Sequence, residues 1–350
     1  MVFTDMKVIK LKFVDMTRGF VPDSNFWYNF LSKFYKIELS ETPDYLIYSV
    51  FGSDHLKYNC IKIFWTGENQ SPDFNICDYA IGFDYLQFGD RYFRFPLYYI
   101  YEDPFVKMQH KHEFSNLNLE NKTEFCSFVY SNNHASPERQ MIFDKLSAYK
   151  KVVSGGRFLN NIGEAVKDKI EFQARSKFCI AFENASTPGY TTEKLIHAFA
   201  SQTIPIYWGD PTVGQYFNTE NFVNCHDYNS FDEVVERVKF LDNNDDEYLK
   251  MLRAPALKNQ NDRDGKLTVL HAFFENIFEQ PLDKAQRCNR EYWNRKYLKK
   301  QFLLHRAYNN SLRGIAERFY MRLFRKIERK NKSIFLWKIH KTLMKWMGKN

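Results

Sequence analysis

Apolar and polar residues follow two different periods in the first part of the chain. Residues 7–14 (KVIKLKFV) alternate with a period of two, as in a strand, whereas residues 24–35 carry apolar positions at helical spacing after a Pro-Asp turn. Further short strands are predicted at residues 45–51, 60–65 and 79–83. This succession of strands and helix-like segments indicates an α/β layer.

The second half of the chain repeats this pattern. Strands are predicted at residues 125–131, 178–182 and 204–208, and helices at 164–177, at 192–201 and from Ser136-Pro137-Glu138 onward. Serine as N-cap, proline at the first helical position and an early acid are typical of a helix start. Two α/β halves predict two Rossmann-like domains facing a cleft. We place their limits at residues 1–118 and 119–285, followed by a tail at 286–350.

The charge of the chain is concentrated in this tail. Residues 313–350 contain twelve Lys or Arg and two Glu, a net charge of +10, whereas the whole chain carries +8, so the remainder is close to neutral. A neutral body argues against a nucleic-acid groove in the folded part. Ile315, Phe319, Leu323 and Ile327 share one helical face with basic residues on the others, which predicts a basic amphipathic helical tail lying on a membrane surface. A helix that packs back on the body and an RNA-binding arm are the alternatives.

Other compositional features point to a cytoplasmic protein at the inner face of the membrane. The apolar runs are far shorter than the roughly 20 residues that span a bilayer. The first 20 residues contain no uninterrupted apolar region of the kind found in signal peptides. The six cysteines include no C-x-x-C pair, which favours reduced, packed thiols over disulfides or a zinc site.

Two basic residues occupy first helical turns, where the helix macrodipole disfavours cations: Arg139 and Lys194. Helix N-termini beyond the carboxyl ends of parallel strands bind anions, so the pair predicts a pyrophosphate site. For either residue alone, a solvated arginine or a lysine paired with an acid is the better interpretation. Glu68 follows a predicted strand and could act as a general base, although its position alone favours a surface acid that caps a turn. The acidic residues 242–247 are interpreted as solvated and not as a metal site.

Several segments resemble the α1,3/4-fucosyltransferase family. The runs F-E-N at 182–184, Y-x-T-E-K at 190–194 and IPIYWGDP at 204–211 are similar to its signature in residues and in spacing. Residues 64–86 and 126–132 resemble the acceptor-domain and donor-domain segments of bacterial members. The chain departs from the family at Ala185, where a small hydroxyl residue is common, and it lacks the leucine-rich heptads of some members, so no dimer is inferred.

This resemblance implies an α/β fold of GT-B type and an inverting transfer of L-fucose from GDP-fucose. The acceptor would be the 3-OH or 4-OH of GlcNAc in a β-galactosyl-GlcNAc glycan, as in Lewis antigens on surface glycans. By position, Arg139 and Lys194 would bind the pyrophosphate, Glu193 the donor hydroxyls, Asn184 and Tyr190 would complete the pocket, and Glu68 would be the general base. No metal is strictly required, although Mn²⁺ or Mg²⁺ could stimulate turnover. The alternatives are a GT-B transferase for another sugar nucleotide and a basic nucleic-acid-binding protein.

Overall fold

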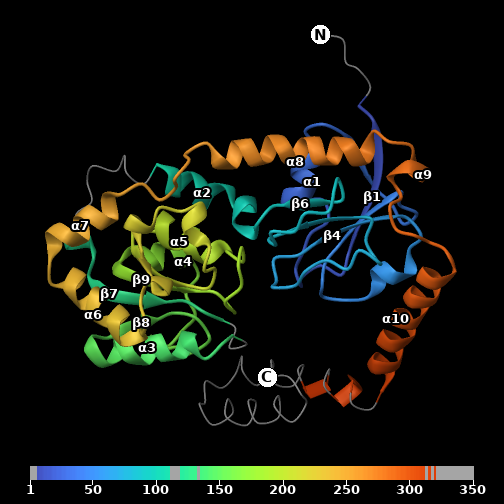
Figure 1. Cartoon of the computed structure of the whole chain (residues 1–350). Helices are drawn as coiled ribbons and strands as arrows, with labels where there is room; N and C mark the ends of the chain where they lie inside the picture. The colour runs from blue at the N-terminus through green and yellow to red at the C-terminus, as the bar shows by residue number, and fades with distance from the viewer. Residues whose placement is uncertain (1–5, 111–118, 132–134, 312–313, 317–318, 321–350) are drawn as a thin grey trace.

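The computed structural model describes residues 6–110, 119–131, 135–311, 314–316 and 319–320, which form two lobes side by side (Figure 1). Each lobe contains one parallel sheet. The first sheet has the strand order β2-β1-β3-β4-β5-β6 and consists of β1 Val8–Val14, β2 Lys36–Leu39, β3 Tyr45–Tyr48, β4 Ile61–Trp65, β5 Tyr79–Gly82 and β6 Tyr92–Arg94. The second has the order β11-β10-β9-β7-β8 and consists of β7 Glu124–Phe128, β8 Val152–Ser154, β9 Ser176–Phe182, β10 Ile204–Trp208 and β11 Val223–Asn224.

Helices cover both faces of the second sheet. The α-helices of the described residues are α1 Phe26–Leu31, α2 Glu102–Gln109, α3 Glu138–Tyr149, α4 Lys169–Ala174, α5 Glu193–Ala200, α6 Phe231–Asp242, α7 Asp245–Arg253, α8 Asp262–Phe278, α9 Leu282–Ala285 and α10 Tyr292–Asn310. Helices α3, α6 and α7 enclose one core with this sheet, and α4 and α5 pack on its other face, where α2 packs against α5. The expectation of two α/β domains is confirmed.

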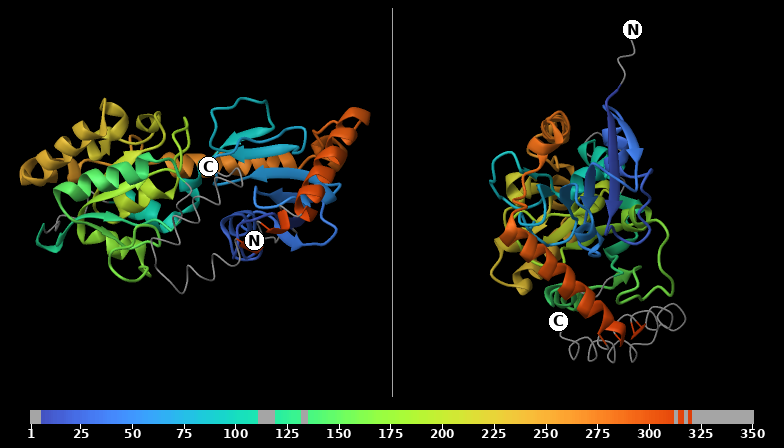
Figure 2. Two further views of the ribbon diagram at one scale, coloured as in Figure 1. Left: turned by 90° about the horizontal axis from the view of Figure 1, so that it is seen from below. Right: turned by 90° about the vertical axis from the view of Figure 1, so that its right-hand side faces the viewer.

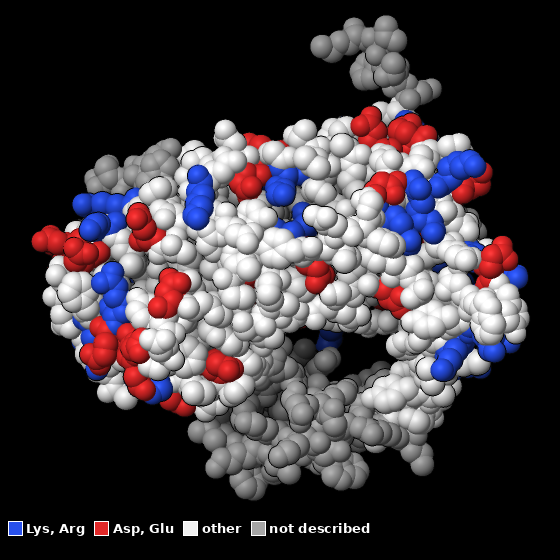
Figure 3. All heavy atoms as spheres, viewed as in Figure 1, with Lys and Arg blue, Asp and Glu red and all other residues white. Residues whose placement is uncertain are grey.

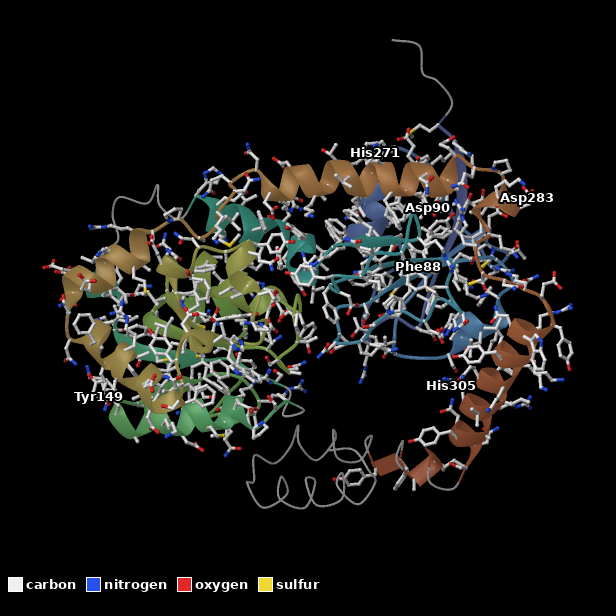
Figure 4. The ribbon with its side chains drawn as sticks, viewed as in Figure 1. Phe88, Asp90, Tyr149, His271, Asp283 and His305 are labelled. Atoms are coloured by element: carbon white, nitrogen blue, oxygen red, sulfur yellow. The ribbon has the colours of Figure 1, made fainter. Side chains whose placement is uncertain are left out.

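Helix α8 connects the two lobes. It starts beside the second lobe, runs along one edge of the molecule and ends over the first sheet (Figure 1). Its residues Leu270, Phe274 and Phe278 are completely buried in the core that also contains Trp27 and Phe30 of α1. His271, labelled in Figure 4, stacks on Phe34 with ring centroids 3.7 Å apart.

The expected domain limits therefore differ from the packing at two places. The segment after residue 261 was assigned to the second domain, but α8 and α9 complete the core of the first lobe. Helix α2 was assigned to the first domain, but it packs against α5 of the second lobe. Both differences arise because an apolar helix face packs against whichever surface it reaches, which the linear pattern does not reveal.

Two helix predictions also need correction. The helix expected at residues 164–177 is only α4, because Asp168 caps it and the chain enters β9 at Ser176. The Asp168 side chain accepts a hydrogen bond from the backbone N–H of Glu171 at 2.9 Å. In α3 the N-cap is Pro137, not Ser136. The Ser136 N–H instead donates to the carbonyl of Asn184 at 2.9 Å, which joins the start of α3 to the end of β9.

The predicted tail begins with residues that pack on the first lobe. The buried Asp78 carboxylate accepts backbone hydrogen bonds from Arg287 at 2.8 Å and from Cys288 at 2.7 Å. Helix α10 follows and lies on the outer side of the first lobe (Figure 2). The amphipathic stretch predicted after residue 320 lies outside the described residues.

Candidate functional site

A cleft of about 520 Å³ lies between the lobes. The six residues singled out in the sequence all line it, although Glu68 belongs to the first lobe and the other five to the second. Prominent lining residues are Phe20, Trp27, Phe51, Trp65, Glu68 and Leu97 from the first lobe, with Tyr130, Arg139, Lys169, Asn184, Tyr190, Glu193 and Lys194 from the second. Many of them follow the carboxyl ends of β3, β4, β7 and β9, where open α/β sheets bind ligands.

The buried Glu183 positions residues on the second-lobe side of the cleft. It is completely buried and accepts hydrogen bonds from the backbone N–H of Thr192 at 2.8 Å, from the Thr192 hydroxyl at 2.7 Å and from Lys194 Nζ at 3.0 Å. Gly209 makes room for it, because a Cβ there would stand 2.4 Å from Glu183 Cγ. The carboxylate thus fixes the first turn of α5 and the lysine on it.

Lys194 is held between two carboxylates. Its ammonium lies 3.0 Å from Glu183 Oε2 and 3.7 Å from Glu193 Oε1. Burial alone would lower its pKa, but these two carboxylates raise the pKa of Lys194 above its ordinary value. A lysine in a first helical turn is therefore stabilised by acids, and it still lines the cleft. The pairing with an acid, which the sequence offered as the alternative to an anion site, is therefore present, and Lys194 lines the cleft as well.

Arg139 is also anchored from the second lobe. Its Nη2 donates to the carbonyl of Phe182 at 3.1 Å and to Asn184 Oδ1 at 2.7 Å, and its guanidinium lies 4.1 Å from the centre of the Tyr130 ring. Only 1% of the residue is exposed. The solvated surface arginine considered from the sequence is therefore wrong. Arg139 and Lys194 lie in one cleft, as the anion-site hypothesis requires.

Glu193 faces a strongly positive environment. Burial would raise its pKa, but Lys194, Lys169 and His197 outweigh burial and lower the pKa of Glu193 to about 2. Burial, followed by repulsion from Lys169, lowers the pKa of His197 to about 4. Near neutral pH Glu193 is therefore a carboxylate, and His197 beside it is an uncharged imidazole.

Glu68 lies across the cleft in the loop after β4. Glu68 is exposed, and its backbone N–H donates a hydrogen bond to the Thr66 hydroxyl at 3.1 Å. Its neighbour Asn69 donates to the Thr187 hydroxyl at 2.8 Å, which ties this loop to the second lobe. The Tyr190 hydroxyl approaches the carbonyl of Gly67 at 3.5 Å. The loop is thus positioned by the same segment that carries the donor-side residues.

Aromatic side chains form the wall on the first-lobe side. Trp27 and Trp65 meet edge to face with ring centroids 5.2 Å apart, and neither indole N–H has a hydrogen-bond partner among the described residues. Of the aromatic stretch 92–101, Tyr98 and Tyr99 are buried in the core, whereas Tyr101 lines the cleft. Trp27 is almost completely buried, so the half-buried faces of Trp65 and Tyr101 are the ones that suit a sugar ring.

Sequence reasoning missed Glu183 as an organiser and Lys169 as a cleft residue. Lys169 stands in the first turn of α4, as Arg139 and Lys194 do in α3 and α5. The signal was available, because Asp168 followed three residues later by Glu171 is typical of a helix start. Among the described residues no group of His, Cys, Asp or Glu could hold a metal ion. In the acidic stretch 242–247, Asp242 pairs with Lys150 and Lys177.

Two family models match the chain. Residues 11–101 match the alpha-(1,3)-fucosyltransferase FucT N-terminal domain, and residues 119–255 match the C-terminal part of glycosyltransferase family 10 (fucosyltransferase). The chain is 38% identical to an alpha-(1,3)-fucosyltransferase of Helicobacter pylori over 72% of its own length and 61% of that relative, so it spans about three fifths of the relative.

A solved structure and a mammalian enzyme show further similarity. A crystal structure of an α1,3-fucosyltransferase with GDP-fucose superposes with a TM-score of 0.67 at 34% identity, covering 80% of this chain and 93% of that one. A 4-galactosyl-N-acetylglucosaminide 3-alpha-L-fucosyltransferase of Bos taurus is 32% identical over 37% of this chain and 36% of its own. The expected GT-B arrangement is confirmed by the structural match.

Proposed function

Because this chain belongs to glycosyltransferase family 10, the fucosyltransferases, we propose that it transfers L-fucose from GDP-β-L-fucose to the 3-OH of GlcNAc in β-galactosyl-GlcNAc glycans. The observation that carries the proposal is the cleft, in which Glu68 of one lobe faces the cations Arg139 and Lys194 of the other. The names of similar proteins support both the donor and the acceptor class.

In this proposal the two sides of the cleft divide the chemistry. Glu68 removes the proton from the acceptor hydroxyl, which attacks the anomeric carbon from the face opposite the nucleotide and so converts a β-linked donor into an α-fucoside. Arg139 and Lys194 bind the pyrophosphate and stabilise the charge that develops on the departing GDP. Asn184 orients the arginine, as its 2.7 Å hydrogen bond indicates. Glu193 and Tyr190 hold hydroxyl groups of the donor.

Two cations already neutralise the leaving group in this scheme, so transfer is expected to proceed without a metal. Mn²⁺ or Mg²⁺ would then act only by screening the diphosphate. The aromatic wall of Trp27, Trp65 and Tyr101 lies on the side from which the acceptor must approach. We assign the half-buried faces of Trp65 and Tyr101 to contacts with the acceptor sugars.

The test is mass spectrometry of N-acetyllactosamine after incubation with GDP-fucose and the purified protein, in EDTA and again with Mn²⁺. A gain of one deoxyhexose in EDTA is the expected result, and NMR of the product assigns the 3-OH or 4-OH linkage. No product in either buffer, together with no thermal stabilisation by GDP-fucose, would overturn the proposal. Stabilisation without product would retain the donor and reject the acceptor.

We also propose that the basic tail brings the enzyme to an anionic membrane surface on the cytoplasmic side, where lipid-linked glycans occur. None of the described helices is long and apolar enough to cross a bilayer. Helix α10 exposes Tyr292 and Trp293, with Trp293 75% exposed, between lysine and arginine residues. On the face shown in Figure 3, the basic and acidic side chains of the described residues are interspersed and form no basic stripe.

Vesicle co-sedimentation tests the tail. The full chain is expected to sediment with vesicles containing phosphatidylglycerol and to be released by salt, because each basic residue near an anionic surface contributes about 1 kcal/mol. A chain ending at residue 311 should bind much less. Equal sedimentation of both chains, or equal binding to pure phosphatidylcholine, would contradict the membrane role.

A further inference from the structure

Phe51 lies between two hollows of the molecule. Its side chain lines the cleft, and it also lines a groove of about 620 Å³ between residues 50–53, which follow β3, and helix α10. We call this second hollow the α10 groove. Phe51 is 52% exposed although its side chain is large and apolar, and exposed apolar surface of this kind marks binding sites. The cleft and the α10 groove therefore adjoin at this residue.

Helix α10 turns one continuous face toward the groove. Gln301, Leu304, His305 and Tyr308 line it at spacings of three and four residues, with Asn309 beside them. His305 is labelled on α10 in Figure 4. Leu304 is 53% exposed and Tyr308 45% exposed, so about half of each side chain is accessible to a ligand. This face combines apolar surface with amide, imidazole and phenol groups.

The wall formed by residues 50–53 is fixed by the buried carboxylate of Asp15. This carboxylate accepts hydrogen bonds from the backbone N–H groups of Asp54 and His55, each at 2.9 Å, and lies 2.7 Å from His55 Nδ1. The Phe51 N–H donates to the Asp15 carbonyl at 3.1 Å. Gly52 packs so closely on Asp15 that a Cβ there would meet its Oδ1 at 2.1 Å. The backbone beside Phe51 is thus held in place without a ligand.

The wall formed by α10 is fixed to the same lobe. The Tyr297 hydroxyl donates to Asp73 Oδ2 at 2.6 Å, and the side-chain amide of Asn294 donates to the Asn75 carbonyl at 3.1 Å. Both walls of the α10 groove therefore belong to the first lobe, which is the acceptor side of the proposed reaction. A groove that is formed before binding loses little entropy when a ligand enters it.

The lining of the α10 groove fits a neutral saccharide. Among the residues that the structure describes, no Lys, Arg, Asp or Glu lines it. A nucleic acid or an anionic lipid headgroup would require cations there. The rings of Phe51 and Tyr308 offer flat apolar faces, and Ser53, Gln301 and Asn309 carry hydroxyl and amide groups that donate and accept hydrogen bonds. Sugars present the same combination of an apolar face and hydroxyl groups.

We propose that the α10 groove binds the extension of the acceptor glycan, an inference that rests on the proposed function. While the cleft holds the GlcNAc that receives fucose, further sugars of the same glycan continue past Phe51 and pack on Tyr308. The second contact is then intramolecular, so it strengthens binding of long acceptors. The groove does not touch the reacting atoms. It should therefore lower the Michaelis constant for long acceptors and leave the turnover number unchanged.

The experiment compares transfer to N-acetyllactosamine with transfer to a hexasaccharide of three N-acetyllactosamine units. Tyr308→Ala removes a ring from the groove, and the control Tyr292→Ala removes an exposed tyrosine at the start of the same helix. Tyr308→Ala should raise KM for the hexasaccharide about fivefold, equivalent to about 1 kcal/mol, at unchanged kcat. Its constants for the disaccharide should be those of the wild type, and Tyr292→Ala should match the wild type throughout.

A second pair of variants repeats the comparison with aliphatic side chains. Leu304 lines the groove, whereas its neighbour Leu303 is equally exposed, at 50%, but lies outside it. Leu304→Ala should raise KM for the hexasaccharide, and Leu303→Ala should not. Saturation-transfer difference NMR with the hexasaccharide and GDP gives a readout that needs no turnover. The wild type should saturate protons of more than one disaccharide unit, and Tyr308→Ala of only one.

The outcomes separate this inference from the proposed function. An unchanged KM of Tyr308→Ala for the hexasaccharide, or an equal rise for the disaccharide, would overturn the inference and leave the proposed function standing. Weaker sedimentation of Tyr308→Ala with anionic vesicles, at unchanged hexasaccharide kinetics, would assign the groove to lipid and also overturn it. A wild type that transfers fucose to neither acceptor would reject the proposed function, and the inference with it.

Discussion

Replacing Glu183 with glutamine is predicted to destabilise the protein and to weaken donor binding. The carboxylate is completely buried and receives three hydrogen bonds, two from Thr192 and one from the ammonium of Lys194. Glutamine has nearly the same shape, but its amide nitrogen can only donate. In either orientation of the amide, its nitrogen would therefore face a donor of Thr192 or Lys194. Glu193, at 3.7 Å, would be the only acid left beside the lysine.

The magnitude follows from burial on both sides of this pair. The Lys194 side chain is 13% exposed and that of Glu183 is 0% exposed, so water can replace little of the lost interaction. Breaking a buried ion pair by neutralising one partner costs about 3–5 kcal/mol. Because glutamine retains one acceptor and Glu193 remains as a second acid, we expect the lower end, about 3 kcal/mol.

Urea titration followed by circular dichroism measures the loss of unfolding free energy, and the Michaelis constant for GDP-fucose measures the loss of donor binding. Glu171→Gln, which changes an exposed glutamate on α4, is the matched control. The double variant Glu183→Gln with Lys194→Met should regain stability, because no unpaired ammonium remains, but it should not regain donor affinity.

Two results would refute this reasoning. An unfolding free energy of Glu183→Gln within about 0.5 kcal/mol of the wild type would mean that the pair contributes little, as exposed pairs do. A double variant as unstable as the sum of the two single variants would mean that Glu183 and Lys194 act independently.

Three further predictions address other parts of the cleft. Glu68→Gln should lower turnover at least about 10²-fold with unchanged calorimetric affinity for GDP, and retained turnover would reject the base assignment. Gly189→Ala should cost about 1–2 kcal/mol in urea titration, because Gly189 has φ +82° and a Cβ would meet the Phe83 carbonyl at 2.6 Å; unchanged stability would contradict this. The pKa of His197 is lowered from 6.5 to about 4, so the unfolded chain binds more protons between these values and stability falls as pH drops through them. His197→Gln should remove part of that fall, and parallel pH profiles for both proteins would be the contrary result.

The predictable part of the fold is the part in which local pattern and tertiary packing agree. Strands β4, β9 and β10 were predicted because their apolar runs are short and bounded by turns, and β1 because its apolar and polar residues alternate. Strand β2 was missed because its residues Lys36–Leu39 are mostly exposed at the sheet edge, so it carries no apolar run. The packing of α8 could not be predicted for another reason, since its apolar positions show that a face is buried but not against which sheet.

The six predicted site residues could be assigned to one cleft because each follows a strand or opens a helix at the carboxyl edge of a sheet. Their partners were less predictable. Glu183 lies within an apolar strand end, and only the distance to Lys194 and the absence of a side chain at Gly209 reveal that it acts as an organiser. Contacts between residues distant along the chain, such as Asn69 with Thr187, carry no local pattern.

The three cations at helix starts oppose the local electrostatic preference. A cation at a helix N-terminus costs about 0.3–1 kcal/mol, so Arg139, Lys169 and Lys194 together weaken α3, α4 and α5. Buried carbonyl and carboxylate groups offset this cost for Arg139 and Lys194, whereas Lys169 receives no such direct contact from the described residues. A diphosphate bound by Arg139 and Lys194, as proposed, would reverse the sign of the interaction for these two. Donor binding should therefore stabilise the second lobe more than its contact area alone would, and the excess should shrink in Lys194→Met.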